Sequence, residues 1–396
     1  MSWLSALSSL AHAPTSRTAR PTVDVVLLSV VLCLAAFGLL MVYSASIALG
    51  DGPQFSGYGR YYFVLRHALF LGLGLFFAVL AALVPMKRWQ QWALPLFFAG
   101  LLLLVLVLVP GIGREVNGAR RWLPLGIINI QPSEVMKVLM LLYAADYTVR
   151  KREHLSAFFR GLLPMILSVL VVGGLLLLEP DLGAFIVIGA IAMGMVFIGG
   201  LNMKHFAAMA LGLIASFLAM IWYSPWRRER LFVYLDPWNP ENAYGSAYQL
   251  SHSLIAFGRG EWFGVGLGAS VEKLHYLPEA HTDFIAAVIG EELGFVGITA
   301  LIVVFAFIVW RSFDIGRQAL AMERLFGAMV SQGVGLWFGL QTFINIGVCL
   351  GLLPTKGLTL PMVSYGGSGI VVNLIAMALL LRVDYENRKL MRGKSK

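Results

Sequence analysis

Charge is scarce in this sequence. Only 13% of its 396 residues are Asp, Glu, Lys or Arg, whereas ordinary soluble domains carry about 25%. Hydrophobic residues make up 59% of the chain, and the mean hydropathy is +0.79. Water cannot solvate a surface of this composition, so a soluble fold is excluded. Apolar runs follow one another from Val25 to Leu381 and leave no room for a large soluble domain.

Cysteine is also scarce, and repeats are absent. The two cysteines, Cys33 and Cys349, lie inside apolar runs, which argues against a disulfide or a metal site. No repeat of about 20 to 50 residues and no low-complexity segment is visible. The first apolar run, from Val25 to Val42, is longer than a signal-peptide core of about 7 to 15 residues. We therefore expect an uncleaved first membrane span.

Apolar runs that could cross a membrane recur along the chain. A bilayer core about 30 Å thick needs roughly 20 apolar residues per helix. The fourth run is the weakest, because Glu134, Lys137 and Asp146 interrupt it. We predict an all-α fold, a polytopic transmembrane helical bundle of about ten spans. These are 24–47, 62–84, 91–110, 133–149, 161–178, 182–200, 205–223, 283–310, 325–350 and 363–382.

Basic residues decide the orientation of the bundle. With ten spans, one side receives Arg17, Arg20, Lys87, Arg88, Arg150, Lys151, Arg152, Arg160, Lys204, Arg311, Arg317, Arg324, Arg382, Arg388, Lys389, Arg392, Lys394 and Lys396. That side is cytoplasmic by the positive-inside rule, so both termini are expected in the cytoplasm. Nine spans would separate the termini, which this charge bias opposes. Basic clusters beside apolar spans are topology signals, and no nucleic-acid partner is expected.

Three regions follow from this topology. We predict a cytoplasmic N-terminal segment 1–23, a membrane domain 24–382 with one long external loop 224–280, and a basic cytoplasmic tail 383–396. The external side also carries cations that the topology rule does not require: Arg114, Arg120, Arg121, Arg227, Arg228, Arg230, Arg259, Lys273 and Lys356. An anionic ligand would explain them. Lipid headgroups or ordinary salt bridges would explain them equally well.

Carboxylates gather toward the same side. Asp283 stands at the mouth of the eighth span, where Asp283 or Thr282 could cap the helix. A carboxylate there could also serve as a base or a cation ligand, since the helix dipole favours its ionised form. Glu291 and Glu292 follow eight and nine residues later, about 12 Å deeper in a straight helix. At that depth they indicate a polar cavity, an ion pathway or a structural hydrogen bond.

Other polar groups accompany them. The spacing of Glu134 and Lys137 allows an ion pair on one helix face. Glu179-Pro180-Asp181 predicts a tight external turn with two more carboxylates. A glycine-rich stretch from Gly258 to Gly268 lacks the Lys-Ser/Thr of a phosphate loop. It therefore predicts turns beside a re-entrant or interfacial segment, 248–257.

Six motifs then make the sequence recognisable. In chain order they are Gly118-Ala-Arg-Arg-Trp-Leu, Gln131-Pro-Ser-Glu, Glu179-Pro-Asp-Leu-Gly, Pro278-Glu-Ala-His-Thr-Asp-Phe, Gly290-Glu-Glu-Leu-Gly and Gly357-Leu-Thr-Leu-Pro-Met-Val-Ser-Tyr-Gly-Gly-Ser. The chain resembles the SEDS family (shape, elongation, division and sporulation) from about Asp24 to Tyr385. Asp236-Pro-Trp, Tyr248-Gln-Leu and Lys273-Leu-His-Tyr-Leu-Pro-Glu resemble its cell-division branch more than its elongation branch. Gly369 departs from the pattern, since a second serine often follows Gly-Gly-Ser.

The resemblance implies a peptidoglycan glycosyltransferase that polymerises lipid II into glycan strands at the outer face of the bacterial cytoplasmic (inner) membrane, at the division septum. Its implied partners are lipid II, an undecaprenyl-pyrophosphate-linked disaccharide peptide, a single-pass class B penicillin-binding transpeptidase and other division-complex membrane proteins. A lipid II flippase is the first alternative, favoured by Asp146, Glu291 and Glu292 at depth. A non-catalytic division scaffold is the second.

The family pattern also implies site residues. Asp283, in the His-Thr-Asp motif, would be the general base toward the acceptor sugar hydroxyl. Glu134 and Lys137 would form or orient the substrate cavity. A divalent cation, Mg²⁺ or Mn²⁺, could bridge Asp283 and the pyrophosphate. The sequence shows no metal-ligand spacing that establishes one.

Further residues are expected to touch the substrate. Arg121, Arg259 and Lys356 would contact the pyrophosphate. His281 and Ser364, which lie in the fourth and sixth motifs, would line the substrate site.

Overall fold

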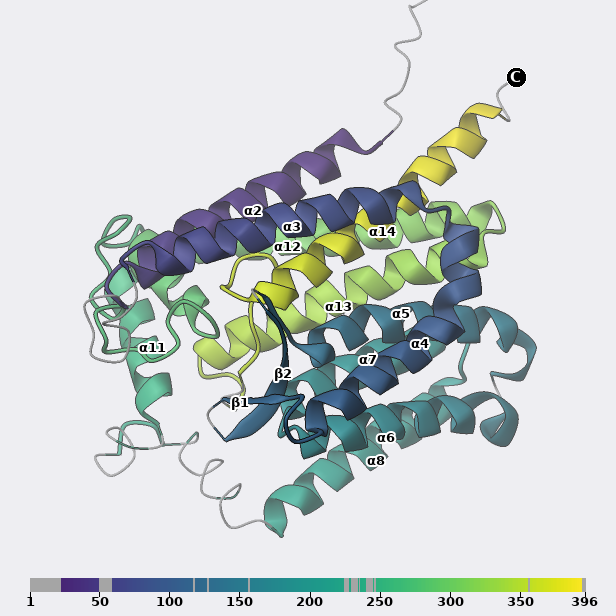
Figure 1. Cartoon of the computed structure of the whole chain (residues 1–396), viewed down its shortest axis with the longest axis horizontal. Coiled ribbons are helices and arrows are strands. Elements are labelled where there is room, and N and C mark those ends of the chain that lie inside the picture. The colour runs from purple at the N-terminus through teal and green to yellow at the C-terminus, as the bar shows by residue number, and fades with distance from the viewer. Residues whose placement is uncertain are drawn as a thin grey trace, which may run out of the picture.

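The computed structural model of the chain consists mainly of long helices (Figure 1). It describes residues 23–49, 59–116, 118–126, 128–155, 157–223, 247–354 and 357–393, with a few positions between 228 and 245. Several basic residues named above lie outside these ranges, namely Arg17, Arg20, Arg227, Arg230, Lys356, Lys394 and Lys396.

Each predicted span corresponds to a helix in the described part of the chain. These helices are α2 (Val25–Ser46), α3 (Tyr62–Leu83), α4 (Met86–Leu108), α5 (Pro132–Arg150), α6 (Leu163–Leu178), α7 (Leu182–Ile198), α8 (Met203–Trp222), α12 (Ile285–Ala321), α13 (Leu325–Cys349) and α14 (Gly367–Gly393). A short 3₁₀ turn (Arg152–His154) and a π turn (Phe158–Leu162) join α5 to α6. Six helical segments of the described residues are long and apolar enough to cross a membrane.

Apolar side chains cover the outside of the bundle. On α3, Leu65 is 66% exposed and Val79 is 61% exposed. Such a surface is stable only when hydrocarbon surrounds it, and helices satisfy their backbone hydrogen bonds internally there. The chain is therefore a polytopic membrane protein. Both cysteines are free.

Helices α5 and α13 form the centre of the bundle. α5 packs against α4, α7, α13 and α14, and nearly all of its residues are buried. Glu134, Lys137 and Asp146 therefore face other parts of the protein and not lipid. Their position explains why a predicted span with three charged residues is nevertheless a helix of the bundle.

Ionic contacts join the start of α2 to the last turns of α14 at one end of the bundle. The backbone N–H of Asp24 donates to Asp384 over 2.9 Å. Arg311 donates to Asp24 over 2.5 Å, and Arg388 donates to Asp384 over 2.7 Å. The start of α2 and the last turns of α14 are therefore neighbours, as Figure 1 shows. This agrees with the prediction that both termini lie on one side.

A small antiparallel sheet lies toward the opposite end. Its strands are β1 (Arg114–Val116), β2 (Ala119–Leu125) and β3 (Ile128–Ile130), in the order β1-β2-β3. The all-α prediction omitted it. The missed signal is Asn117-Gly118 between β1 and β2, because this dipeptide favours tight hairpin turns. Gly118 has φ +75°, which glycine adopts without strain.

Helix α11 (Tyr248–Gly260) crosses the ends of the long helices (Figure 1). It includes the segment 248–257, which was expected to be re-entrant or interfacial. The loop after it enters a break in α12 at Gly294, whose φ is +67°. There the Val265 N–H donates to the Glu291 carbonyl over 3.0 Å, and the Phe295 N–H donates to the Glu261 carbonyl over 2.9 Å. The loop thus satisfies backbone groups that the break frees.

The break corrects the depth predicted for Glu291 and Glu292. Ser44, at the last turn of α2, donates to Glu292 over 2.7 Å. Glu292 therefore lies beside the last turn of α2, and its depth does not follow from its distance along a straight helix. The prediction assumed one straight helix from Asp283 through the bilayer, whereas the break at Gly294 separates the turns that carry Glu291 and Glu292 from the rest of α12. The argument for a flippase loses two of its three residues.

Candidate active site

Asp283 lies just before α12, in a loop held by α13. Phe284 is the N-cap residue and no side chain caps the helix, so the capping role suggested for Asp283 or Thr282 is wrong. The Asp283 carbonyl accepts from Asn345 Nδ2 over 2.8 Å. A Cβ built on Gly357 would lie 2.7 Å from Asp283 Oδ2. Glycine at 357 is what gives this carboxylate its space.

Several charges act on Asp283. Burial raises its pKa to about 7, and the negative charges of Glu279, Asp181 and Glu134 add to that rise. The Arg121 guanidinium opposes it. The side chain is nevertheless partly exposed. Asp283 thus combines accessibility with a pKa near neutrality, which suits a proton acceptor at physiological pH.

Glu134 and Lys137 form the predicted ion pair on α5. Lys137 Nζ lies 2.7 Å from Glu134 Oε1, and Lys137 is fully buried. Lys137 also donates to Gln341 Oε1 over 3.2 Å. The other carboxylate oxygen of Glu134 is buried without a hydrogen-bond partner among the described residues. It lies 3.3 Å from a Cβ built on Gly369, so a serine at this position would stand beside it.

The Glu179-Pro180-Asp181 turn fixes Arg121 beside this site. Arg121 Nε donates to the Glu179 carbonyl over 2.9 Å, and a terminal nitrogen donates to the Pro180 carbonyl. Asp181 caps α7 through the Ala184 N–H at 3.0 Å. Arg121 is therefore held through backbone carbonyls, which leaves its positive charge uncompensated by these contacts.

The sequence indicates Glu179 only as one of two carboxylates in a predicted turn. The structure shows an unusual environment for its side chain. Its carboxylate is fully buried, and neither oxygen has a hydrogen-bond partner among the described residues. Burial and the neighbouring Asp181 raise the pKa of Glu179 to about 8. At neutral pH this carboxyl is mostly protonated.

His281 and Ser364 also lie in this region. The His281 ring packs against Phe63 and Tyr365, with centroids 4.9 and 5.4 Å apart. Burial lowers the pKa of His281 to about 4, so the ring is neutral at physiological pH. The Ser364 hydroxyl accepts from the Leu360 N–H over 2.7 Å and closes a turn. A role of either residue in substrate binding stays a prediction.

Arg259 belongs to a second cluster. Its guanidinium lies 3.3 Å from Glu291 Oε1. The buried Lys273 donates to Glu292 over 2.7 Å and to Ser44 over 2.9 Å. Of the explanations given above for the external cations, an ordinary salt bridge is the one that applies to Lys273. Of the three cations expected at the pyrophosphate, the structure brings Arg121 to Asp283, places Arg259 beside Glu291 and does not describe Lys356.

Two buried amides of α13, Gln341 and Asn345, are not among the site residues predicted from the sequence. Gln341 and Asn345 are 0% and 2% exposed and donate to the backbone carbonyls of Asp283 and of residues 358 and 359. Their signal was polar residues four apart in an apolar helix. Among the described residues, no group of three His, Cys, Asp or Glu side chains could hold a metal ion. A cation shared between Asp283 and the pyrophosphate stays a prediction.

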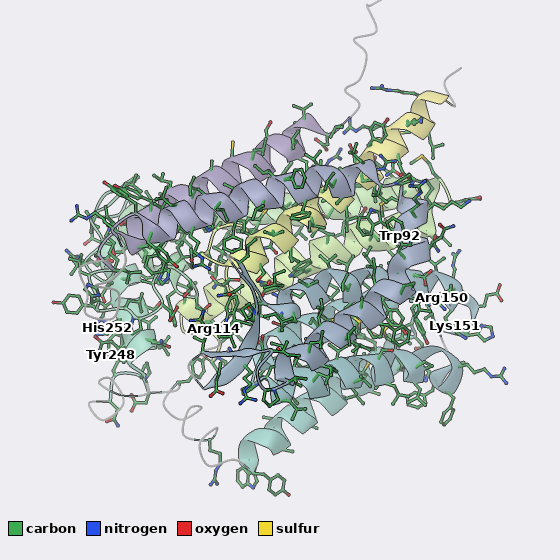
Figure 2. All side chains as sticks on the ribbon, viewed as in Figure 1. Trp92, Arg114, Arg150, Lys151, Tyr248 and His252 are labelled. Carbon is green, nitrogen blue, oxygen red and sulfur yellow. The ribbon has the colours of Figure 1, made fainter. Side chains whose placement is uncertain are left out.

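Figure 2 shows labelled residues at the two ends of the bundle. Arg114, Tyr248 and His252 lie toward one end, whereas Trp92, Arg150 and Lys151 lie toward the other. The Asp283 site lies at the end opposite Arg150, because Glu134 is in the first turn of α5 and Arg150 is the last residue of that helix. It is therefore separated by the length of the bundle from the basic end.

Known proteins resemble this chain over nearly its whole length. A family model described as "Cell cycle protein" matches residues 24–389. A probable peptidoglycan glycosyltransferase FtsW of Burkholderia thailandensis is 60% identical over 381 residues, covering 95% of this chain and 82% of that protein. Its counterpart from Nitrosomonas europaea is 49% identical over 98% of this chain and 99% of that protein.

Two solved structures share the fold. One, described as "Structural coordination of polymerization and crosslinking by a peptidoglycan synthase complex", has a chain with a TM-score of 0.73 and 31% identity, over 92% of this chain and 98% of that one. The rod shape determining protein RodA of Thermus thermophilus gives a TM-score of 0.66 at 31% identity, over 92% of this chain and 97% of that one.

Proposed function

Because the chain belongs to the SEDS family of cell-cycle proteins, we propose that Asp283 is the general base of a lipid II polymerase. The chain is a peptidoglycan glycosyltransferase, as its relatives of up to 60% identity are named. The observation that carries the proposal for Asp283 is its partly exposed carboxylate with a pKa of about 7.

The reaction requires one proton transfer and one bond exchange. The acceptor sugar hydroxyl gives its proton to the Asp283 carboxylate while its oxygen attacks the anomeric carbon of the donor sugar. The bond from that carbon to the pyrophosphate oxygen breaks, and the lipid pyrophosphate leaves with the electron pair. The energy of the new glycosidic bond comes from this pyrophosphate ester, so no nucleotide is needed.

Arg121 has the position to stabilise the leaving group. A pyrophosphate gains charge as the bond breaks, and a fixed cation favours that state over the ground state. The backbone carbonyls that hold Arg121 do not neutralise its charge. Glu134 and Lys137 form the inner wall of the site, and the lipid tail would lie between helices at the apolar surface.

The site lies at the end of the bundle opposite its basic end, which supports synthesis at the outer face of the cytoplasmic membrane. A single-pass class B penicillin-binding transpeptidase is the proposed partner, supported by the likeness to a chain of a peptidoglycan synthase complex. The similarity of this chain to FtsW relatives supports its placement at the division septum with other division proteins. When bound, a divalent cation would supply positive charge between Asp283 and the pyrophosphate.

The test is polymerisation of lipid II by the purified chain in detergent, where no gradient or second compartment exists. The wild type should elongate glycan, which a flippase or a scaffold would not do. Asp283→Asn keeps the side-chain volume but removes the base, so polymerisation should vanish while thermal stability changes little. Asp314→Asn, at the basic end of α12, is the matched control and should stay active. Robust synthesis by Asp283→Asn would refute the assignment.

A further inference from the structure

Helix α13 presents a row of polar side chains at a spacing of four residues. Trp337, Gln341, Asn345 and Cys349 are all buried, with exposures of 0 to 2%. Residues four apart share one face of a helix. Buried amides lose their hydration and need partners. The hydrogen-bond partners of the two amides, Gln341 and Asn345, include residues of the segments that carry the proposed active site.

Gln341 connects the ion pair of α5 to the loop before α14. Its Oε1 accepts from Lys137 over 3.2 Å and from Trp337 Nε1 over 2.7 Å. Its Nε2 donates to the Thr359 carbonyl over 2.8 Å. The amide orientation is set by these partners, because Lys137 and Trp337 can only donate and a carbonyl can only accept.

Asn345 makes the corresponding connection one turn further along α13. Its Nδ2 donates to the Leu358 carbonyl over 2.6 Å and to the Asp283 carbonyl over 2.8 Å. An amide nitrogen carries two hydrogens, so both are used. The opposite amide orientation would set an oxygen against two carbonyl oxygens, which only repel it.

The two amides therefore hold one segment, 357–360, from the same helix face. At one end of this segment Gly357 lies against the Asp283 carboxylate. At the other end Thr359 is tied through Gln341 to the ammonium of Lys137. Asp283 belongs to the loop before α12 and Lys137 to α5, and α13 is the common support of both.

We propose that Gln341 and Asn345 are positioning residues that fix the Asp283 carboxylate relative to the Glu134–Lys137 pair. They act through the backbone of segment 357–360 and, for Asn345, through the Asp283 carbonyl, and they do not touch the substrate. The inference rests on the proposed function, since it assigns catalysis to Asp283. A misplacement of about 1 Å far from the reacting atoms can cost about 10²-fold in rate.

The test compares Gln341→Met and Asn345→Leu with a control on the same helix. Gln332→Met replaces another buried amide of α13, which packs against Gly316 toward the basic end. We expect kcat for polymerisation to fall by about tenfold or more in both test variants. KM for lipid II should stay within about threefold, because substrate contacts remain. Gln332→Met should keep near-normal kcat.

A second measurement does not depend on activity. Hydrogen exchange followed by mass spectrometry should show faster exchange in segments 281–285 and 357–366 of both variants, and unchanged exchange there in Gln332→Met. Asn345→Ser stays polar but cannot reach both carbonyls, and it serves as the test variant if Asn345→Leu fails to fold.

The outcomes separate two failures. A wild type that does not polymerise lipid II would refute the proposed function, while hydrogen exchange would still test the support of segment 357–360. An active wild type with near-normal kcat in the Gln341 and Asn345 variants would overturn the positioning role. Equal losses of kcat in Gln332→Met would also overturn it, since any buried amide of α13 would then have the same effect.

Discussion

Asp283 owes its chemistry to its burial and to the charges around it. An ordinary aspartate is almost fully ionised at neutral pH and is a weak base, since its pKa is about 3.9. Burial and three neighbouring carboxylates raise the pKa of Asp283 to about 7. A base with a pKa close to the working pH accepts a proton more effectively in the transition state.

This assignment gives the pH dependence a definite sign. Asp283 must be ionised to act, so kcat/KM should fall as the pH drops below about 7. Glu279→Gln removes a negative charge that raises the pKa of Asp283, so the acid limb should move to lower pH. Arg121→Gln removes the charge that opposes the rise, so the limb should move to higher pH. pH profiles of polymerisation check both directions, and shifts of the same sign would contradict the assignment.

The external arginines should differ in their effect on rate. Arg121→Ala should lower polymerisation by about tenfold or more, equivalent to roughly 1.4 kcal/mol in the barrier. Arg259→Ala should change the rate little, because Glu291 keeps the Ser270 hydroxyl and the Val271 N–H as partners. Lys356→Ala completes the series expected from the family pattern. Steady-state polymerisation rates of purified, correctly folded variants test these expectations. Near-normal rates for all three would return these cations to the lipid-headgroup explanation.

At the scale of elements, the break in α12 shapes the outer end of the bundle. The loop after α11 fills the break, and a Cβ on Gly294 would come within 2.4 Å of the Gly264 nitrogen. Lys273, Glu292 and Ser44 then fasten this loop to α2. The two glutamates and Lys273 thus have a structural role in an assembly of loop, α2 and α12.

The Lys273–Glu292 pair permits a stability prediction. Both side chains are almost fully buried, at 3% and 0% exposure. Removal of one partner leaves an uncompensated buried charge, which costs about 3 to 5 kcal/mol. Lys273→Met should therefore lower thermal stability in detergent markedly. The double variant Lys273→Met/Glu292→Leu should recover much of it, because no charge is left unpaired. A double variant less stable than the single one would contradict this account.

The sequence predicts the long helices of the bundle, because each of them is marked by an apolar run. Apolar runs sufficed for the helices, since a bilayer requires nearly the same length of each. The break at Gly294 could not be predicted, because glycines are frequent along this chain and only the tertiary fit of Gly264 beside Gly294 marks that one. Asp283 was predicted from the family motif around it, and the Glu134–Lys137 pair from the spacing of the two residues. The support by Gln341 and Asn345 depends on which carbonyls approach α13, and a local pattern does not contain that.

At the scale of the whole molecule, the two ends of the bundle carry different kinds of charge. The basic end holds interlocked pairs such as Arg324 with Glu386 and Arg311 with Asp24. The opposite end holds the Asp283 site, with carboxylates and Arg121 around a partly exposed base. A polymerase that builds wall outside the membrane needs the second end to face outward. The positive-inside rule assigns the first end to the cytoplasm independently of any motif.

Topology is therefore the prediction on which every site assignment depends. A reporter fused after Lys396 should report the cytoplasm, and one inserted near Glu241 should report the external side, because an odd number of spans separates them. Both positions lie outside the helices and strands of the described residues. Labelling of single cysteines by an impermeant reagent in whole cells, placed near Glu241 and near Lys151, gives an independent readout, with label at the first position alone. A cytoplasmic signal near Glu241 would place Asp283 and Arg121 on the side without the growing wall and would overturn the proposed active site.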